Sequence, residues 1–152
     1  MTLLRTVGRW QPVLQRKYAH MCDADRAVWE AWLLTHGPEL LSVDYDVHVA
    51  GNRQPPDGHS TSIKRDWSAL TSKRIDVVGY RYDEVWIIEV KRHALWSAVG
   101  QLLTYRMLWE AQWTDPRPTR MVLVCETVDQ DLMVTLTAHG ITVSRAAVAP
   151  GT

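Results

Sequence analysis

Three ionisable residues near the middle of the chain have types and a spacing that could do chemistry on a phosphate ester. Glu89 and Lys91 follow an apolar run and are two positions apart, so they project to the same side of a strand. Asp76 interrupts a second apolar run, and the polar residues around Tyr82 predict a short reversal that pairs the two runs. We therefore expect Asp76, Glu89 and Lys91 to converge at one place in a β-sheet.

Such a convergence favours a divalent cation. Burial of an unpaired carboxylate is costly, so two buried acids need positive charge nearby. The carboxylates of Asp76 and Glu89, with the backbone carbonyl of Val90, are hard oxygen donors that suit Mg²⁺ or Mn²⁺. A cation held there would activate water and neutralise charge on a phosphoryl oxygen, and Lys91 would add a fixed positive charge. The alternative is an ion pair between the acids and Lys91 that needs no metal.

The segment that follows Lys91 predicts an amphipathic helix with two polar residues on one face. Gln101 and Tyr105 are four positions apart, which places them on the same side of a helix. Apolar residues such as Leu102 and Trp109 can pack around them. Their polar tips could then steady Lys91 and a phosphate beside the two acids.

The chain at this point resembles the PD-(D/E)XK nuclease superfamily, and within it the exonuclease-like and resolvase-like branch that is marked by a QxxxY helix. The residues that carry the resemblance are, in chain order, Asp76, Glu89, Lys91, Gln101 and Tyr105. The resemblance implies metal-dependent hydrolysis of phosphodiester bonds in DNA. It makes Asp76 and Glu89 metal ligands, Lys91 the catalytic lysine, and Gln101 and Tyr105 supporting residues.

Two further positions bear on this resemblance. Related nucleases often place a carboxylate on the helix before the first strand, where it reaches the metal, and Glu30 is the candidate here; a solvent-facing Glu30 is the alternative. Ile75 precedes Asp76 where the family name has a proline, which is a departure from the pattern.

The other predicted elements fit one α/β domain. Apolar periodicity and breakers predict a helix over 24–35, strands over 42–50, around Asp76 and over 85–90, the helix with Gln101, a strand over 119–126, a helix over 129–139 and a strand over 141–145. This α-β-β-β-α-β order, with a helix and a strand appended, predicts a mixed central sheet flanked by helices. It is the restriction-endonuclease-like core that the resemblance implies. We expect an N-terminal arm over 1–22, the domain over 23–146 and a tail over 147–152.

Basic residues around the predicted centre are candidates for contacts with DNA. The irregular stretch 51–72 leads into the Asp76 strand, and loops of this length tend to be functional or mobile. A tryptophan there could stack on a base while neighbouring cations bind phosphates. Solvated surface charge is the alternative for each of them. The candidates are Lys64, Arg65, Trp67, Lys73, Arg74 and Arg92.

The overall charge leaves a second class of function open. The chain has 17 basic and 17 acidic residues and a formal net charge of zero, so its total charge does not indicate a nucleic-acid binder. The same fold with idle chemistry could serve as a structural module, for instance in a phage head–tail connector with other virion proteins as partners. The resemblance also implies a homo-oligomer, because small nucleases of this type often need a second copy.

The remaining features exclude several classes of protein. Cys22 and Cys125 lie far apart, which predicts free thiols in a reducing compartment and too few ligands for an iron–sulfur cluster. The chain has no apolar run long enough to cross a membrane. We therefore expect a location in the cytoplasm or in a virion.

Overall fold

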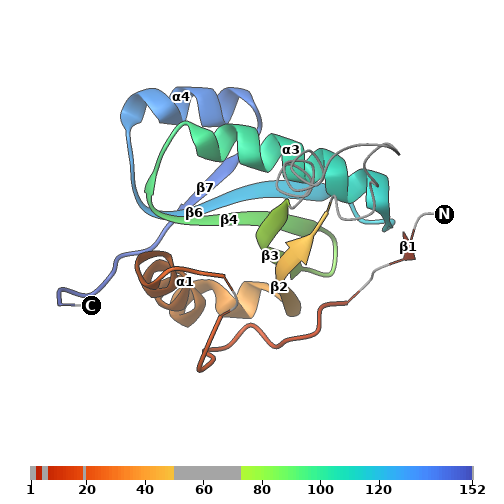
Figure 1. Cartoon of the computed structure of the whole chain (residues 1–152), viewed down its shortest axis with the longest axis horizontal. Coiled ribbons are helices and arrows are strands. Elements are labelled where there is room, and N and C mark those ends of the chain that lie inside the picture. The colour runs from red at the N-terminus through yellow and green to blue at the C-terminus, as the bar shows by residue number, and fades with distance from the viewer. Residues whose placement is uncertain (1–2, 5–6, 19, 50–72, 152) are drawn as a thin grey trace, which may run out of the picture.

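The computed structural model describes residues 3–4, 7–18, 20–49 and 73–151 of the 152-residue chain. They form an α/β fold with a five-stranded mixed sheet and three helices (Figure 1). The elements in chain order are β1 (Leu3–Leu4), α1 (Asp23–His36), a 3₁₀ turn (Gly37–Glu39), β2 (Ser42–His48), β3 (Arg74–Tyr80), β4 (Val85–Ala94), α3 (Ser97–Gln112), β5 (Trp113–Thr114), β6 (Thr119–Val128), α4 (Gln130–Ala138) and β7 (Thr142–Arg145).

The order of strands in the sheet is β2-β3-β4-β6-β7, and its two halves run differently. β3 is antiparallel to β2 and to β4, whereas β4, β6 and β7 are parallel. A tight reversal, in which the Arg81 amide donates to the Glu84 carbonyl, joins β3 to β4. The parallel strands are joined by α3 and α4, since a parallel connection must cross back over the sheet. β1 and β5 form a separate two-stranded parallel pair.

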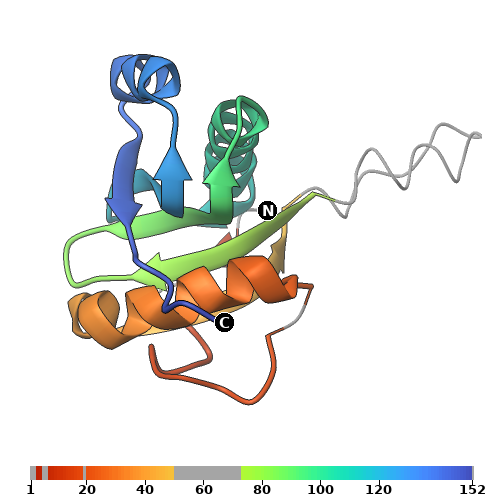
Figure 2. The same ribbon diagram turned by 90° about the vertical axis from the view of Figure 1, so that its left-hand side faces the viewer.

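The helices form a layer on each face of the sheet (Figures 1 and 2). α1 covers one face, and α3 and α4 cover the other. β4 is apolar on both faces, as its sequence predicts: Ile88 and Val90 belong to the α1 core, and Ile87 belongs to the core beneath α3 and α4. The α1 core also holds Trp29 and Trp32, whose rings stack with centroids 5.0 Å apart. This two-sided burial makes β4 the centre of the molecule.

The N-terminal segment lies against β2. Trp10 pairs with Val43 through two backbone hydrogen bonds of 2.9 and 2.8 Å. A β-carbon at Gly8 would come within 2.6 Å of the Val43 backbone, so a glycine is required for the segment to lie this close. Tyr18, at the end of the segment, is buried in the α1 core. The predicted arm is therefore attached to the domain in the part that the structure describes.

Two expectations from the sequence were wrong in detail: a strand that ends at Glu89 and Lys91, and an alternation that puts Val43 and Val47 on one side of the strand 42–50. Glu89 and Lys91 do not end their strand, because parallel pairing with β6 extends β4 to Ala94. β2 does not keep one alternation either: Val43 belongs to the α1 core and Val47 to the opposite core. The change of core lies at Asp46, which has a positive φ of 52°, and the paired strand β3 changes core at the same level, between Val77 and Ile75.

Candidate active site

The predicted centre lies where the sheet divides. Pairing between β3 and β4 runs from Tyr80 and Val85 as far as Val77 and Ile88. Beyond that point β3 stays paired with β2, and β4 stays paired with β6. Asp76 and Glu89 are the next residues on the two separating strands. The amide N–H of Val90 donates to Oδ2 of Asp76 at 3.0 Å, so the carboxylate reaches across the gap to β4.

Glu89 is buried but only half satisfied. Its side chain is 2% exposed, and the Lys91 Nζ lies 3.3 Å from its Oε1. Its Oε2 is buried and has no hydrogen-bond partner within the described part of the chain. The two-residue spacing brings Glu89 and Lys91 to one side of β4, as the sequence predicts. One carboxylate oxygen is thus left without a donor when both acids are ionised, whereas a proton on Glu89 lets the two acid side chains form a hydrogen bond with each other.

The electrostatics of the centre show a shortage of positive charge. Burial, together with the negative charge of Asp76, raises the pKa of Glu89 to about 8. Burial also raises the pKa of Asp76, although the Val90 amide and the Lys91 charge oppose that rise. Burial would lower the pKa of Lys91, but Glu89, Asp76 and Asp25 outweigh it and raise that pKa. One lysine therefore does not neutralise the two buried acids.

The helix α3 brings the two predicted polar residues to the same place. Tyr105 is buried, and burial together with the charges of Glu89 and Asp76 raises its pKa to about 12. Its hydroxyl consequently keeps its proton and can act as a donor toward the acids. Oε1 of Gln101 is buried without a hydrogen-bond partner among the described residues, and the Gln101 side chain contacts Tyr105.

The helix α1 contributes a carboxylate that our sequence analysis missed. Oδ1 of Asp25 accepts a hydrogen bond from the Arg92 amide at 2.9 Å, and its Oδ2 lies 4.0 Å from the Lys91 Nζ. The predicted Glu30 lies instead 3.5 Å from Arg26. Five positions separate Asp25 from Glu30, which is about 140° around a helix. The acid of α1 that meets the centre is therefore Asp25 and not Glu30.

A signal for Asp25 was present in the sequence. It precedes the buried Val28, Trp29 and Trp32 by three, four and seven positions, the spacing of residues on one helical face. An acid on the apolar stripe of a helix points toward the sheet. Glu30 falls outside that stripe.

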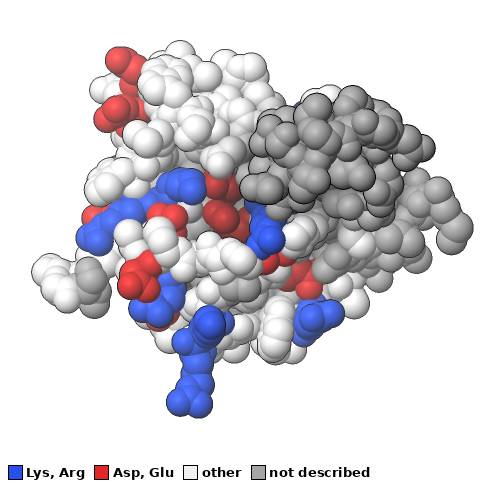
Figure 3. Space-filling view, in the orientation of Figure 1, with Lys and Arg blue, Asp and Glu red and all other residues white. Residues whose placement is uncertain are grey.

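The predicted DNA-binding residues divide into two groups. Lys64, Arg65 and Trp67 lie outside the described residues. The other three are close in the chain to the residues of the centre: Lys73 and Arg74 precede Asp76, and Arg92 follows Lys91. Both arginines are paired with acids, since Arg74 Nη1 lies 3.3 Å from Asp46 Oδ2 and Arg92 Nε lies 3.5 Å from Glu126 Oε2. Figure 3 shows acidic side chains in a recess between α1 and α3, with basic side chains on both sides of it.

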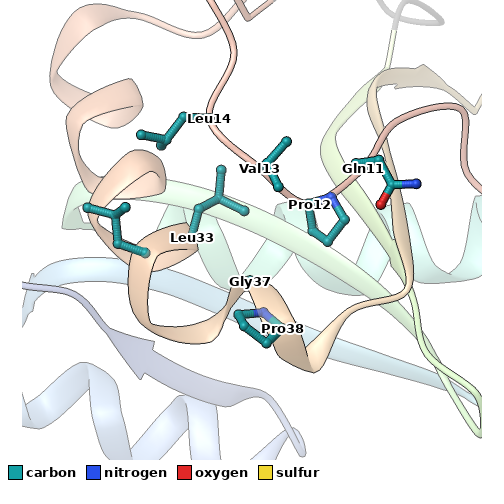
Figure 4. Close-up of a pocket in the computed structure, with 8 residues that line it drawn as sticks. Gln11, Pro12, Val13, Leu14, Leu33, Gly37 and Pro38 are labelled. Carbon is teal, nitrogen blue, oxygen red and sulfur yellow. The ribbon is translucent and has the colours of Figure 1, made fainter.

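A separate hollow of about 380 Å³ lies between the N-terminal segment and α1 (Figure 4). Pro12, Val13 and Leu14 line one side, and Leu33 and Leu34 line the other. Its lining side chains carry no ionisable group, so it offers packing and no acid–base chemistry. The hollow is therefore distinct from the ionisable cluster around Glu89.

Comparison with known protein families, with curated proteins and with solved structures finds no match to this chain. The described residues contain no group of three or more His, Cys, Asp or Glu side chains placed to hold a metal ion by themselves. None of the described helices is both long and apolar enough to cross a membrane. Cys22 and Cys125 are free thiols, as their separation in the sequence predicts.

Proposed function

We propose that this chain is a metal-dependent nuclease that hydrolyses phosphodiester bonds in DNA. One observation carries the proposal: Asp76, Glu89 and Lys91 meet where β3 and β4 separate, and a buried oxygen of Glu89 has no donor among the described residues. A pair of coupled buried carboxylates destabilises a metal-free fold. A cation bound between them would offset that cost.

The arrangement of the elements supports the resemblance to the PD-(D/E)XK superfamily. The chain runs α1, β2, β3, β4, α3 and β6, which is the α-β-β-β-α-β order that the resemblance implies, and α4 and β7 are appended. The expected acids lie on β3 and β4, and the expected QxxxY pair lies on the helix between the parallel strands. We therefore also propose that the chain has a restriction-endonuclease-like topology.

The donor set fits Mg²⁺ or Mn²⁺. Mg²⁺ takes one or two carboxylates and completes its six positions with water and substrate phosphate. Asp76 and Glu89 would hold it together with the Val90 carbonyl, so two acidic side chains suffice for such a cation. The bound cation would supply Lewis-acid stabilisation of the phosphoryl oxygens and a water of lowered pKa.

The remaining residues have roles that their contacts suggest. The Lys91 Nζ lies 3.3 Å from Glu89 Oε1 and 4.0 Å from Asp25 Oδ2, so the ammonium is positioned beside the acids. There it can attract the scissile phosphate and stabilise charge that grows on it. Tyr105 keeps its proton at neutral pH and can donate to a phosphate oxygen, and Gln101 orients Tyr105 from one turn away.

The second candidate is the same fold used without catalysis as a structural module in an assembly such as a virion. The balanced charge of the chain favours it, since many nucleases carry a net positive charge. In that case a homo-oligomer or other virion proteins would be its partners. In either case we propose a cytoplasmic or virion location.

The test is cleavage of end-labelled single-stranded and double-stranded DNA in Mg²⁺ or Mn²⁺. We expect cutting by the wild type that is lost in Asp76→Ala and Lys91→Ala and kept in the matched controls Asp131→Ala and Lys17→Ala, whose side chains are exposed elsewhere. Mn²⁺ should also raise the Tm of the wild type and not that of Asp76→Ala, because a ligand of the native state stabilises it by mass action. A folded wild type that neither cuts DNA nor responds to Mn²⁺ would favour the structural module.

A further inference from the structure

Four polar residues continue the candidate site along the ends of the parallel strands. Lys91, Cys125 and Arg145 are partners across β4, β6 and β7, and His93 and Thr127 are partners one pleat further on. Side chains in register point to one face of a sheet. Lys91 and Arg145 are therefore expected on the face of Cys125, and His93 and Thr127 follow them at the ends of the strands; we call Lys91, His93, Thr127 and Arg145 the polar ledge.

The polar ledge lies at the carboxyl ends of the parallel strands, where α3 and α4 begin (Figure 1). Ligands of open sheets bind in the crevice outside these ends. Two strand spacings separate Lys91 from Arg145, which is about 10 Å between the Cα atoms. Figure 3 shows charged side chains extending from the acidic recess over this end of the strands.

Arg145 differs from Arg92, which lies at the same end of the parallel strands. Its Nε and Nη2 donate to the Glu126 carbonyl at 3.1 and 3.0 Å, and a carbonyl carries no net charge to neutralise it. Among the described residues no carboxylate lies within 4.0 Å of its guanidinium, whereas Arg92 is paired with the Glu126 carboxylate at 3.5 Å. Arg145 is thus an exposed, oriented guanidinium whose charge is available to an anion.

A hollow next to Arg145 can hold a group that the arginine binds. It measures about 520 Å³ and is lined by Glu126, Thr127, Arg145, Ala146, Ala147 and Val148. Its volume lies within the usual range for small-ligand sites. His93 and Thr127 are in contact through their side chains at 2.5 Å on the side toward Lys91. The hollow is therefore joined to the candidate active site by polar groups.

We propose that the polar ledge binds the sugar–phosphate backbone of the substrate strand beside the scissile bond, with Arg145 contacting a neighbouring phosphate. The inference rests on the proposed nuclease function, because that function puts a phosphate at Lys91. A stacked strand advances about 3.4 Å per nucleotide, so the phosphate at Arg145 is within about three nucleotides of the scissile one. When the DNA strand lies on the polar ledge, the nucleotide whose phosphate contacts Arg145 would occupy the hollow.

The test compares Arg145→Ala with Arg120→Ala, which removes another exposed arginine, paired with Glu84, from the opposite end of β6. Binding of labelled DNA is followed by fluorescence anisotropy over a series of salt concentrations, and cleavage is followed separately in Mn²⁺. We expect Arg145→Ala to raise Kd and KM by roughly three- to tenfold, to change kcat by less than about twofold, and to lower the salt slope by about one. Arg120→Ala should match the wild type.

Oligonucleotides with one neutral methylphosphonate linkage locate the contact. At one position near the scissile bond, the neutral linkage should weaken binding by the wild type. At that position it should cause no further loss of affinity in Arg145→Ala, because the linkage and the substitution remove the same contact. Additive losses at every position, or a fall in kcat with KM unchanged, would overturn the polar ledge.

The outcomes also separate the two proposals. Cleavage by the wild type that is indifferent to Arg145 keeps the nuclease and rejects the polar ledge. Binding that depends on Arg145 without any cleavage supports a nucleic-acid surface at the polar ledge and rejects the nuclease. Unfolding of Arg145→Ala is excluded by its Tm, and Arg145→Lys, which keeps the charge and alters the donors, should have an intermediate Kd.

Discussion

Two carboxylates of the sheet are almost equally buried and have opposite surroundings. Asp44 of β2 is 4% exposed and Glu89 of β4 is 2% exposed. Asp44 accepts hydrogen bonds on both oxygens, from the Arg9 amide at 2.8 Å and from the Tyr80 hydroxyl at 3.0 Å. Glu89 has Lys91 at one oxygen and no partner within the described residues at the other.

The difference separates a structural acid from one that is placed for a ligand. A buried acid whose oxygens are filled by local donors ties its neighbours together, as Asp44 ties the N-terminal segment to β2 and β3. A buried acid with an open oxygen and a second acid beside it lowers the stability of the protein alone. Burial by itself does not distinguish the two cases; the donors do.

The largest expected effect is on cleavage and concerns Glu89. Glu89→Gln keeps the shape of the side chain and removes a negatively charged ligand for the proposed cation, so we expect the rate of DNA cleavage in Mn²⁺ to fall by about 100-fold or more. Asp44→Asn should leave the rate of the folded protein unchanged. Equal rates for Glu89→Gln and the wild type would show that Glu89 is structural, like Asp44.

The next effect is on stability and concerns Asp44. An amide in place of its carboxylate presents N–H to one of the two donors, so Asp44→Asn should lower the free energy of unfolding by about 1 to 3 kcal/mol. Glu89→Gln should keep or raise the free energy of unfolding of the metal-free protein. Urea unfolding in a chelator measures both, and a loss of stability in both variants would erase the distinction.

The pH dependence of stability follows from the raised pKa of Glu89. Its pKa is about 8 in the folded protein and 4.5 in the absence of the fold, so between these values the folded state holds a proton that the unfolded state has lost. The free energy of unfolding of the metal-free protein should therefore fall as the pH rises from about 4.5 to about 8. Glu89→Gln should flatten this slope and Asp44→Asn should not, as urea unfolding at a series of pH values would show.

The smallest expected effect concerns Asp25, whose surroundings combine features of those of Asp44 and of Glu89. It accepts a hydrogen bond as Asp44 does, yet it also faces Lys91. Asp25→Asn keeps an acceptor for the Arg92 amide and removes the charge near Lys91, so the cleavage rate should fall by roughly three- to tenfold. Glu30→Gln is the matched control on the same helix and should stay within about twofold of the wild type.

Much of the candidate site could be predicted because it depends on local periodicity. The two-residue spacing places Glu89 and Lys91 on one side of a strand, and the four-residue spacing places Gln101 and Tyr105 on one side of a helix. The same periodicity predicted the alternation of helices and strands. Its errors were at the ends of elements and at Asp46, where tertiary pairing extends β4 and a positive φ turns β2.

Other parts of the site depend on contacts between segments that are distant in the chain. Asp25 meets Lys91 because α1 packs across β4, a contact between residues 66 positions apart that no local window contains. Arg145 is in line with Lys91 because two successive parallel pairings have matching registers. Register is set by the packing of the whole core, which neighbouring residues do not encode.

The amino-acid sequence alone determined which residues form strands and helices and which nearby side chains share a face, because backbone geometry repeats every two or every 3.6 residues. The tertiary structure decided where β3 and β4 separate, which acid of α1 reaches the centre, and which oxygen of Glu89 is left without a donor among the described residues. These depend on how both cores fill their space at once, so they follow from the assembled sheet and its helices and not from any single segment.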